Sequence, residues 1–253
     1  MAESAQVVVV SVAYRLGVFG FLYGGPGTDA PGNLGLRDQV LALRWVQENI
    51  AGFGGDPAQV TIFGQSAGSM SVGALVLSPL ADGLFRRAIM MSGAPNSYLG
   101  SEPARKSLNK TLDLAEKLHC NNSENSIPKI LTCLRGKTAQ QLLDSTNLAL
   151  LDGESFIPVY EDRDFLPTPP VVELKSGKSF HKKGIDLMFG VTSGEGSGFV
   201  VPYLPVINSD QIDLKMTRSA LGLLFQIFQL PYYQEVEDFY TKGLNDSDKD
   251  SLR

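Results

Sequence analysis

Residues 60–68 read Val-Thr-Ile-Phe-Gly-Gln-Ser-Ala-Gly, a short apolar run that stops at a Gly-x-Ser-x-Gly pentapeptide. The residues that follow, 69–77, have the small and apolar spacing of a helix. A strand, a sharp turn and a helix form the context in which this pentapeptide carries a nucleophile, because the turn holds the serine hydroxyl clear of the sheet. The stretch therefore predicts that Ser66 is a nucleophile and that the N–H of Ala67 is one donor to an oxyanion. The alternative is an ordinary strand–helix turn with an inert serine.

Apolar runs and helical stripes alternate on both sides of this stretch. Val7–Ala13 and Arg87–Ser92 are predicted to be buried strands, Asp186–Val191 is predicted to be a further strand, and Leu36–Ile50 is predicted to be a helix with one apolar stripe. Further helices are expected over residues 103–119, over 127–134 and beyond 205. Strands alternating with helices predict an α/β fold, a mostly parallel sheet flanked by helices, in a single domain over residues 1–253.

Length and composition describe an ordinary globular chain. It has 253 residues, 43% of them hydrophobic, and a formal net charge of −5. The negative charge argues against nucleic acid as a partner, and no apolar stretch is long enough to span a bilayer. The N-terminus carries no signal peptide, which by itself would indicate the cytosol.

The cysteines and sequons favour a different compartment. Cys120 and Cys133 bracket a polar stretch, and they are either two unrelated buried thiols or a disulfide that closes a surface loop. Asn-x-Ser/Thr sequons occur at Asn109, Asn121 and Asn245. Together these features favour an oxidising secretory compartment, in conflict with the missing signal peptide.

A serine nucleophile of this kind needs an acid that follows a later strand. Glu195 fits because it follows the strand over 186–191 in a glycine-flanked loop. Asp186 lies at the wrong end of that strand, and Asp162 and Asp164 are expected in a solvated turn. The alternative for Glu195 is a surface loop carboxylate.

The base and the second oxyanion donor are the missing parts. The two histidines, His119 and His181, both precede Glu195, whereas the required order along the chain is serine, acid, histidine. His119 is expected at a helix end and His181 in an exposed loop. The glycine-rich run Gly24–Gly27 contains Pro26, which has no N–H, and is expected to be a surface loop rather than an oxyanion loop.

Several longer motifs resemble the type-B carboxylesterase/cholinesterase family, and the match extends from about Val7 to about Pro205. The motifs that carry the resemblance are Tyr14–Leu22, Gly32–Gln39, Ala42–Ile50, Phe53–Pro57, Thr61–Gly68 and Gly190–Ser197.

The resemblance implies an α/β-hydrolase that cleaves carboxylic esters through an acyl-enzyme, with Ser66 as nucleophile and Glu195 as triad acid. It also implies a Cys120–Cys133 disulfide, small-molecule ester substrates, and no cofactor or metal. Gln65 stands where cholinesterases carry glutamate, and Gly198 replaces an aromatic residue that cholinesterases use, so a general carboxylesterase is expected rather than an acetylcholine-hydrolysing enzyme.

The resemblance also sets expectations about the protein as a whole. Family members have an earlier His-Gly-Gly-Gly oxyanion loop and a later catalytic histidine, so the chain resembles an internal piece whose sheet is incomplete at both ends. We therefore expect a secreted or ER-lumenal serine carboxylesterase whose 253-residue chain is inactive alone. A non-catalytic cholinesterase-like adhesion domain is the alternative, and a truncated product with no function is a third possibility.

Overall fold

The computed structural model describes residues 6–121, 126–146, 155–177, 184–195, 212–228 and 232–247. The chain forms two compact units, Met1–Val191 and Thr192–Arg253. Each unit is described by itself.

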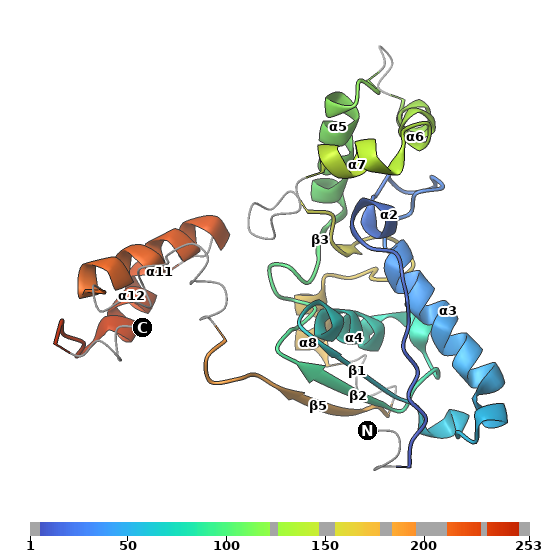
Figure 1. Cartoon of the computed structure of the whole chain (residues 1–253), viewed down its shortest axis with the longest axis horizontal. Coiled ribbons are helices and arrows are strands. Elements are labelled where there is room, and N and C mark those ends of the chain that lie inside the picture. The colour runs from blue at the N-terminus through green and yellow to red at the C-terminus, as the bar shows by residue number, and fades with distance from the viewer. Residues whose placement is uncertain are drawn as a thin grey trace. The chain divides into compact units, whose positions relative to one another are not determined.

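A parallel three-stranded sheet forms the centre of the first unit (Figure 1). The strands lie in the order β1 (Thr61–Gln65), β2 (Arg87–Met91) and β5 (Asp186–Gly190). The register places Phe63, Ile89 and Met188 side by side on adjacent strands. Helix α4 (Ala67–Leu77) packs on one face of this sheet, against β1 and β2. On the opposite face, Phe63 is 51% exposed and Met188 is 66% exposed among the residues that the structure describes.

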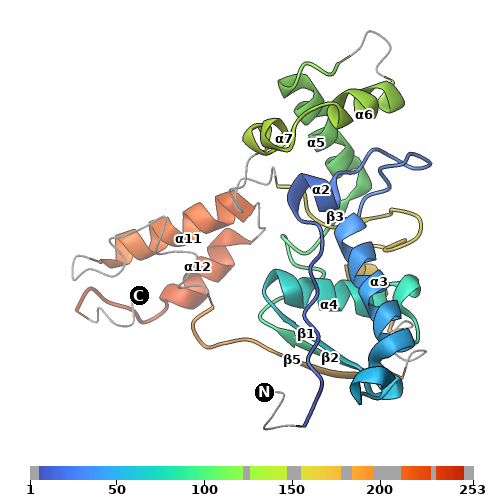
Figure 2. The same cartoon turned by 45° about the vertical axis from the view of Figure 1, so that its right-hand side comes forward.

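A second group of helices lies at the end of the first unit remote from this sheet, as both views show (Figure 2). It comprises α5, α6 and α7, next to a short parallel pair of strands, β3 and β4. The elements of the first unit are α2 (Gly17–Phe21), α3 (Leu34–Asn49), η1 (Ile50–Phe53), η2 (Pro57–Gln59), β1 (Thr61–Gln65), α4 (Ala67–Leu77), η3 (Pro79–Ala81), β2 (Arg87–Met91), β3 (Glu102–Pro103), α5 (Ala104–Lys117), α6 (Ile127–Arg135), α7 (Ala139–Ser145), β4 (Val159–Tyr160), α8 (Pro170–Ser176) and β5 (Asp186–Gly190).

The structure confirms the α/β fold and most of the elements that surround Ser66. The expected apolar stripe of α3 is buried, from Leu36 at 0% exposure to Leu43 and Val46 at 7%. Helix α4 is apolar on nearly all sides, which suits a helix enclosed by its neighbours. Strand, helix and strand therefore follow each other from β1 to β2 as the sequence predicts.

The prediction of a buried strand over Val7–Ala13 is wrong. This segment belongs to no strand, and the side chains of Val7 to Val10 are 41–48% exposed. A run of β-branched residues favours an extended backbone, but a strand also needs a neighbour that supplies its hydrogen bonds. No described strand pairs with these residues.

The prediction that Asp162 lies in a solvated turn is also wrong. Asp162 is 4% exposed, and its carboxylate accepts hydrogen bonds from the backbone N–H groups of Phe165 and Leu166 and from Nδ2 of Asn33. Asn33 also exchanges two hydrogen bonds with the backbone of Val159. Asp164 is exposed as expected, with its carboxylate 3.6 Å from Arg37.

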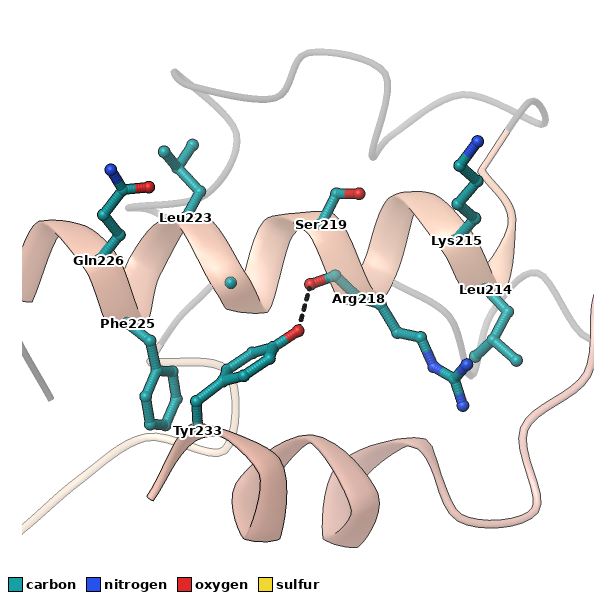
Figure 3. Close-up of a pocket in the computed structure, with 9 residues that line it drawn as sticks. Leu214, Lys215, Arg218, Ser219, Leu223, Phe225, Gln226 and Tyr233 are labelled. Carbon is teal, nitrogen blue, oxygen red and sulfur yellow. Dashed lines mark hydrogen bonds between the residues drawn. The ribbon is translucent and has the colours of Figure 1, made fainter. Parts of the chain in front are cut away.

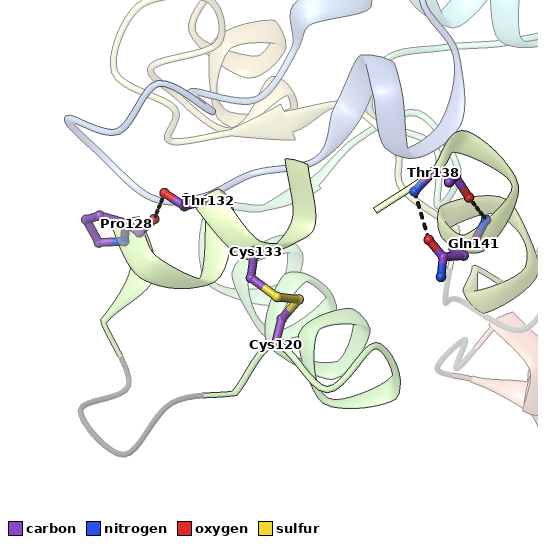
Figure 4. The surroundings of a disulfide bond; sticks show 6 residues. All are labelled: Cys120, Pro128, Thr132, Cys133, Thr138 and Gln141. Carbon is purple, nitrogen blue, oxygen red and sulfur yellow. Dashed lines mark hydrogen bonds between the residues drawn. A yellow bond between two sulfur atoms is a disulfide. The ribbon is translucent and has the colours of Figure 1, made fainter. Parts of the chain in front are cut away.

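Cys120 and Cys133 form a disulfide, with their Cα atoms 5.6 Å apart (Figure 4). The bond joins the residue that follows α5 and its turn to the last turn of α6. The resemblance implied this pairing, and the structure confirms it.

The second unit contains the helices α11 (Leu214–Phe228) and α12 (Tyr233–Thr241). Tyr233 reaches from α12 to α11, where its hydroxyl donates to the Arg218 carbonyl and its ring lies 5.4 Å from that of Phe225 (Figure 3). Arg218 also forms an ion pair with Glu237, at 3.1 Å. The expectation of helices beyond residue 205 is confirmed.

Candidate active site

Ser66 occupies the single-residue turn between β1 and α4, in a backbone conformation that side chains rarely adopt. Its φ is 54° and its ψ is −120°. The Ser66 N–H donates to the Met91 carbonyl of the neighbouring strand at 3.0 Å, and the Ser66 carbonyl accepts from Met70 in the first turn of α4 at 3.0 Å. Strain of this kind persists only where the surroundings fix the residue, and it recurs at functional sites.

Two close backbone approaches explain why glycines surround Ser66. A Cβ on Gly64 would lie 2.4 Å from the carbonyl carbon and oxygen of Gly68, so the end of β1 could not approach the start of α4. A Cβ on Gly93, in the loop after β2, would lie 2.5 Å from the carbonyl oxygen of Ser66. Glycine at both positions lets the strand, the helix and the loop converge on Ser66.

Ser69 ties this loop to the helix, a role that the sequence alone did not indicate. Its side chain is fully buried, and its hydroxyl donates to the Gly93 carbonyl at 2.7 Å. A serine three positions after a nucleophile has no sequence signal of its own, because its acceptor lies 24 residues away. We identify Ser69 as a residue that positions the loop beside Ser66.

Substituting Ser69→Ala should lower the free energy of unfolding by about 0.5–1.5 kcal/mol, because the part-buried Gly93 carbonyl then loses its donor. The control is Ser71→Ala, which truncates a buried serine of the same helix that does not bond to Gly93. Urea unfolding of both variants measures the difference. Equal losses of unfolding free energy in the two variants would show that the hydrogen bond from Ser69 to Gly93 does not contribute to stability beyond the burial of a serine in this helix.

The residue predicted to donate to an oxyanion, Ala67, lies at the start of α4. Ala67 is exposed and is the first residue of α4, so its N–H has no acceptor within the helix. The run Gly24–Gly27 is a turn whose tip, Pro26 and Gly27, is exposed as expected, although Gly24 and Gly25 are buried. The Gly24 N–H is already taken by the Ala30 carbonyl, at 2.8 Å.

Glu195 follows β5 by five residues and lies in an exposed turn of the second unit. Its Oε1 accepts a hydrogen bond from the Thr192 N–H at 2.7 Å. Asp186, at the start of β5, is instead near two arginines, 3.9 Å from Arg86 and 3.6 Å from Arg87. Ser66 belongs to the first unit, so the pairing of Ser66 with Glu195 stays a prediction.

The structure does not assign either histidine as the base for Ser66. His119 is exposed just after the end of α5, with a φ of 53°. His181 lies outside the described residues. Within the ranges that the structure describes, no group of three or more His, Cys, Asp or Glu residues is placed to hold a metal ion.

A hollow of about 1010 Å³ is lined by none of the predicted catalytic residues. It lies in the second unit along α11, and Leu214, Arg218 and Phe225 line it together with Tyr233 of α12 (Figure 3). The candidate site is therefore defined by the Ser66 turn and not by a cavity.

Comparisons with known proteins agree with this geometry. The model of the "Carboxylesterase family" matches residues 1–253. The chain is 42% identical to an acetylcholinesterase of Danio rerio over 85% of its own length and 33% of that protein. It is 42% identical to an acetylcholinesterase of Bungarus fasciatus, covering 85% of the chain and 35% of that protein. It is 39% identical to a cholinesterase of Mus musculus, covering 89% of the chain and 38% of that protein. The chain thus spans 33% to 38% of the length of these curated relatives, and it belongs to the carboxylesterase family.

Proposed function

We propose that this chain carries the nucleophile of a serine carboxylesterase. The observation that supports the proposal most strongly is the Ser66 turn, with its strained backbone between a parallel strand and a buried helix. Gly64 and Gly93 are glycines that this turn requires, because a Cβ at either position would clash with the backbone of Gly68 or Ser66. An inert serine would not need so constrained a position.

The proposed reaction is two acyl transfers. Ser66 Oγ attacks the ester carbonyl while a histidine takes its proton, and the tetrahedral oxyanion is held by the Ala67 N–H and a second donor. The alcohol leaves with that proton, and water then releases the acid from the acyl-serine by the same steps. Glu195 orients the histidine. No cofactor or metal takes part in this scheme.

The substrates we propose are small carboxylic esters in general. Gln65, which immediately precedes Ser66, is exposed and uncharged, so it offers no negative charge to a quaternary ammonium group. Gly198, the other position that argued against choline esters, lies outside the described residues.

A non-catalytic adhesion or interaction domain is the second candidate. The observation that favours it is that His119, the histidine that the structure describes, is exposed just beyond α5, which belongs to the helical group remote from the three-stranded sheet. In that case Ser66 would be a relic of an enzyme.

Labelling with a fluorophosphonate separates the two candidates. In the whole protein we expect labelling at Ser66, found by mass spectrometry of the modified peptide, and no labelling in the Ser66→Ala variant. A whole, folded protein that never labels at Ser66 would support the adhesion domain instead.

We also propose that the protein is secreted or resides in the ER lumen. The Cys120–Cys133 disulfide supports an oxidising compartment, and the sequon residues Asn109, Asn121 and Asn245 are all exposed. In the part of the chain that the structure describes, no helix is long and apolar enough to cross a membrane.

Protein from secretory cells should therefore lose apparent mass on treatment with an N-glycosidase. Glycans are added only in the secretory pathway, so the shift should vanish when all three asparagines are replaced by glutamine. Gel mobility before and after treatment measures it. An unchanged mobility of the wild-type protein would contradict the proposed compartment.

A further inference from the structure

A pocket of about 230 Å³ opens in the first unit, and neither Ser66 nor Glu195 lines it. It lies between the loop after β2, the start of α5 and the start of α8. The lining residues that matter are Tyr98, Glu102, Lys106, Tyr160, Pro169 and Pro170, and we call it the Glu102 pocket.

The charges around this pocket leave one ammonium group without a full counter-charge. The Glu102 side chain is 3% exposed, and its Oε2 accepts from Lys110 Nζ at 2.6 Å. Lys110 is 11% exposed, and its Nζ also donates to the Ser155 carbonyl. The Lys110 ammonium therefore already has two partners within the protein. Lys106 Nζ lies 3.8 Å from the same carboxylate oxygen and is 46% exposed.

One carboxylate thus faces two ammonium groups, and only Lys106 both lines the pocket and meets solvent. Glu161, the residue after Tyr160, is exposed and is not part of the lining. Burial, followed by the charges of Glu161 and Glu102, raises the pKa of the Tyr160 phenol, so this group stays neutral near pH 7. The balance of charge in the pocket favours an anionic ligand.

Part of the pocket wall is aromatic or apolar, beside the polar lining residues Asn96, Ser97 and Ser101. Lys106 Nζ lies 5.3 Å from the centre of the Tyr98 ring, which holds the ammonium beside an aromatic surface. Pro103, Pro169 and Pro170 supply further apolar lining. The volume is below the roughly 300–1000 Å³ of pockets that take drug-sized ligands, so a single ring is the size that fits.

We propose that the Glu102 pocket binds a small organic monocarboxylate with one planar ring. The carboxylate pairs with Lys106, and the ring lies against Tyr98 and the prolines. This site is independent of the proposed function, because it uses neither Ser66 nor Glu195.

The test is titration of the 253-residue chain with 4-fluorobenzoate, followed by the ¹⁹F relaxation of the probe. We expect saturable binding that weakens with added salt. Lys106→Gln should weaken it roughly tenfold or more, because a charge-assisted contact is lost. The half-exposed position of Lys106 leaves the fold intact, which thermal unfolding checks.

Three comparisons complete the test. Arg105→Gln removes a positive charge from the exposed neighbour of Lys106 on α5 and should leave binding unchanged. The neutral probe 4-fluorobenzamide should bind roughly tenfold more weakly than the acid. Ser66→Ala should bind 4-fluorobenzoate like the wild-type chain, so a failed esterase assignment would not affect this result. No saturable binding, equal binding of the amide, or equal losses in the Lys106 and Arg105 variants would overturn the proposal.

Discussion

The 253-residue chain is expected to hydrolyse a p-nitrophenyl ester no faster than its Ser66→Ala variant does. A serine hydroxyl is a weak nucleophile until a base takes its proton, and loss of the base lowers kcat by about 10⁶-fold in a serine hydrolase. His119 is exposed just beyond α5, in the helical group remote from the three-stranded sheet (Figure 2). No histidine follows Glu195 in the sequence. The chain therefore offers a constrained serine without an assigned base.

Free imidazole provides a sharper form of this experiment. If the missing base is the only defect in activating Ser66, added imidazole should raise the rate of the wild-type chain above that of Ser66→Ala, whose rate measures the reaction of imidazole itself. His119→Ala and His181→Ala serve as controls and should change nothing. Turnover that depends on Ser66 without imidazole would contradict the expectation, and its loss in one histidine variant would identify the base.

The features that the sequence predicted well are those encoded within a few residues. The Ser66 turn could be predicted because the apolar run, the glycines and the helical residues that define it are contiguous. The buried stripe of α3 follows from the period of a helix, since Leu36 and Val40 lie on one face whatever packs against them.

The features that were missed depend on partners far away in the chain. Asp162 sits in a polar run that looks solvated, and its burial follows from Asn33, 129 residues earlier. Ser69 acquires its role from a carbonyl of the loop after β2. Val7–Ala13 is the opposite case, because its composition suits a strand but no described strand pairs with it. Local pattern fixes which face of an element is apolar, whereas tertiary contacts decide which polar groups are buried.

Replacing Lys110 by methionine should destabilise the first unit strongly. Met is similar in length but cannot neutralise Glu102, so a 3%-exposed carboxylate would be left without its 2.6 Å partner. Breaking a buried pair in this way costs about 3–5 kcal/mol of unfolding free energy. Lys106→Met should cost under about 1 kcal/mol, because that ammonium is 46% exposed and 3.8 Å away.

The double variant Glu102→Leu/Lys110→Met tests whether the loss comes from the orphaned charge. Removing both charged groups takes away the pair and its desolvation cost together, so most of the stability should return. Urea unfolding of the three variants gives the comparison. A double variant as unstable as Lys110→Met alone would mean that packing, or the contact of Lys110 with the Ser155 carbonyl, causes the loss instead.

The pH dependence of the same variants provides an independent readout. Burial raises the pKa of the Glu102 carboxyl above its usual value, and the ammonium groups of Lys110 and Lys106 offset part of that rise. The folded chain therefore keeps this proton to a higher pH than the unfolded chain does. The contribution of Glu102 to the unfolding free energy is greatest below its unfolded pKa and is lost as the pH rises through the folded pKa.

In Lys110→Met the offset from Lys110 is absent, so the loss of stability should shrink on acidification from about pH 7 to about pH 4. Adding Glu102→Gln to Lys110→Met should remove that pH dependence, because no carboxyl is then left to titrate, and a persistent slope would assign it to another group.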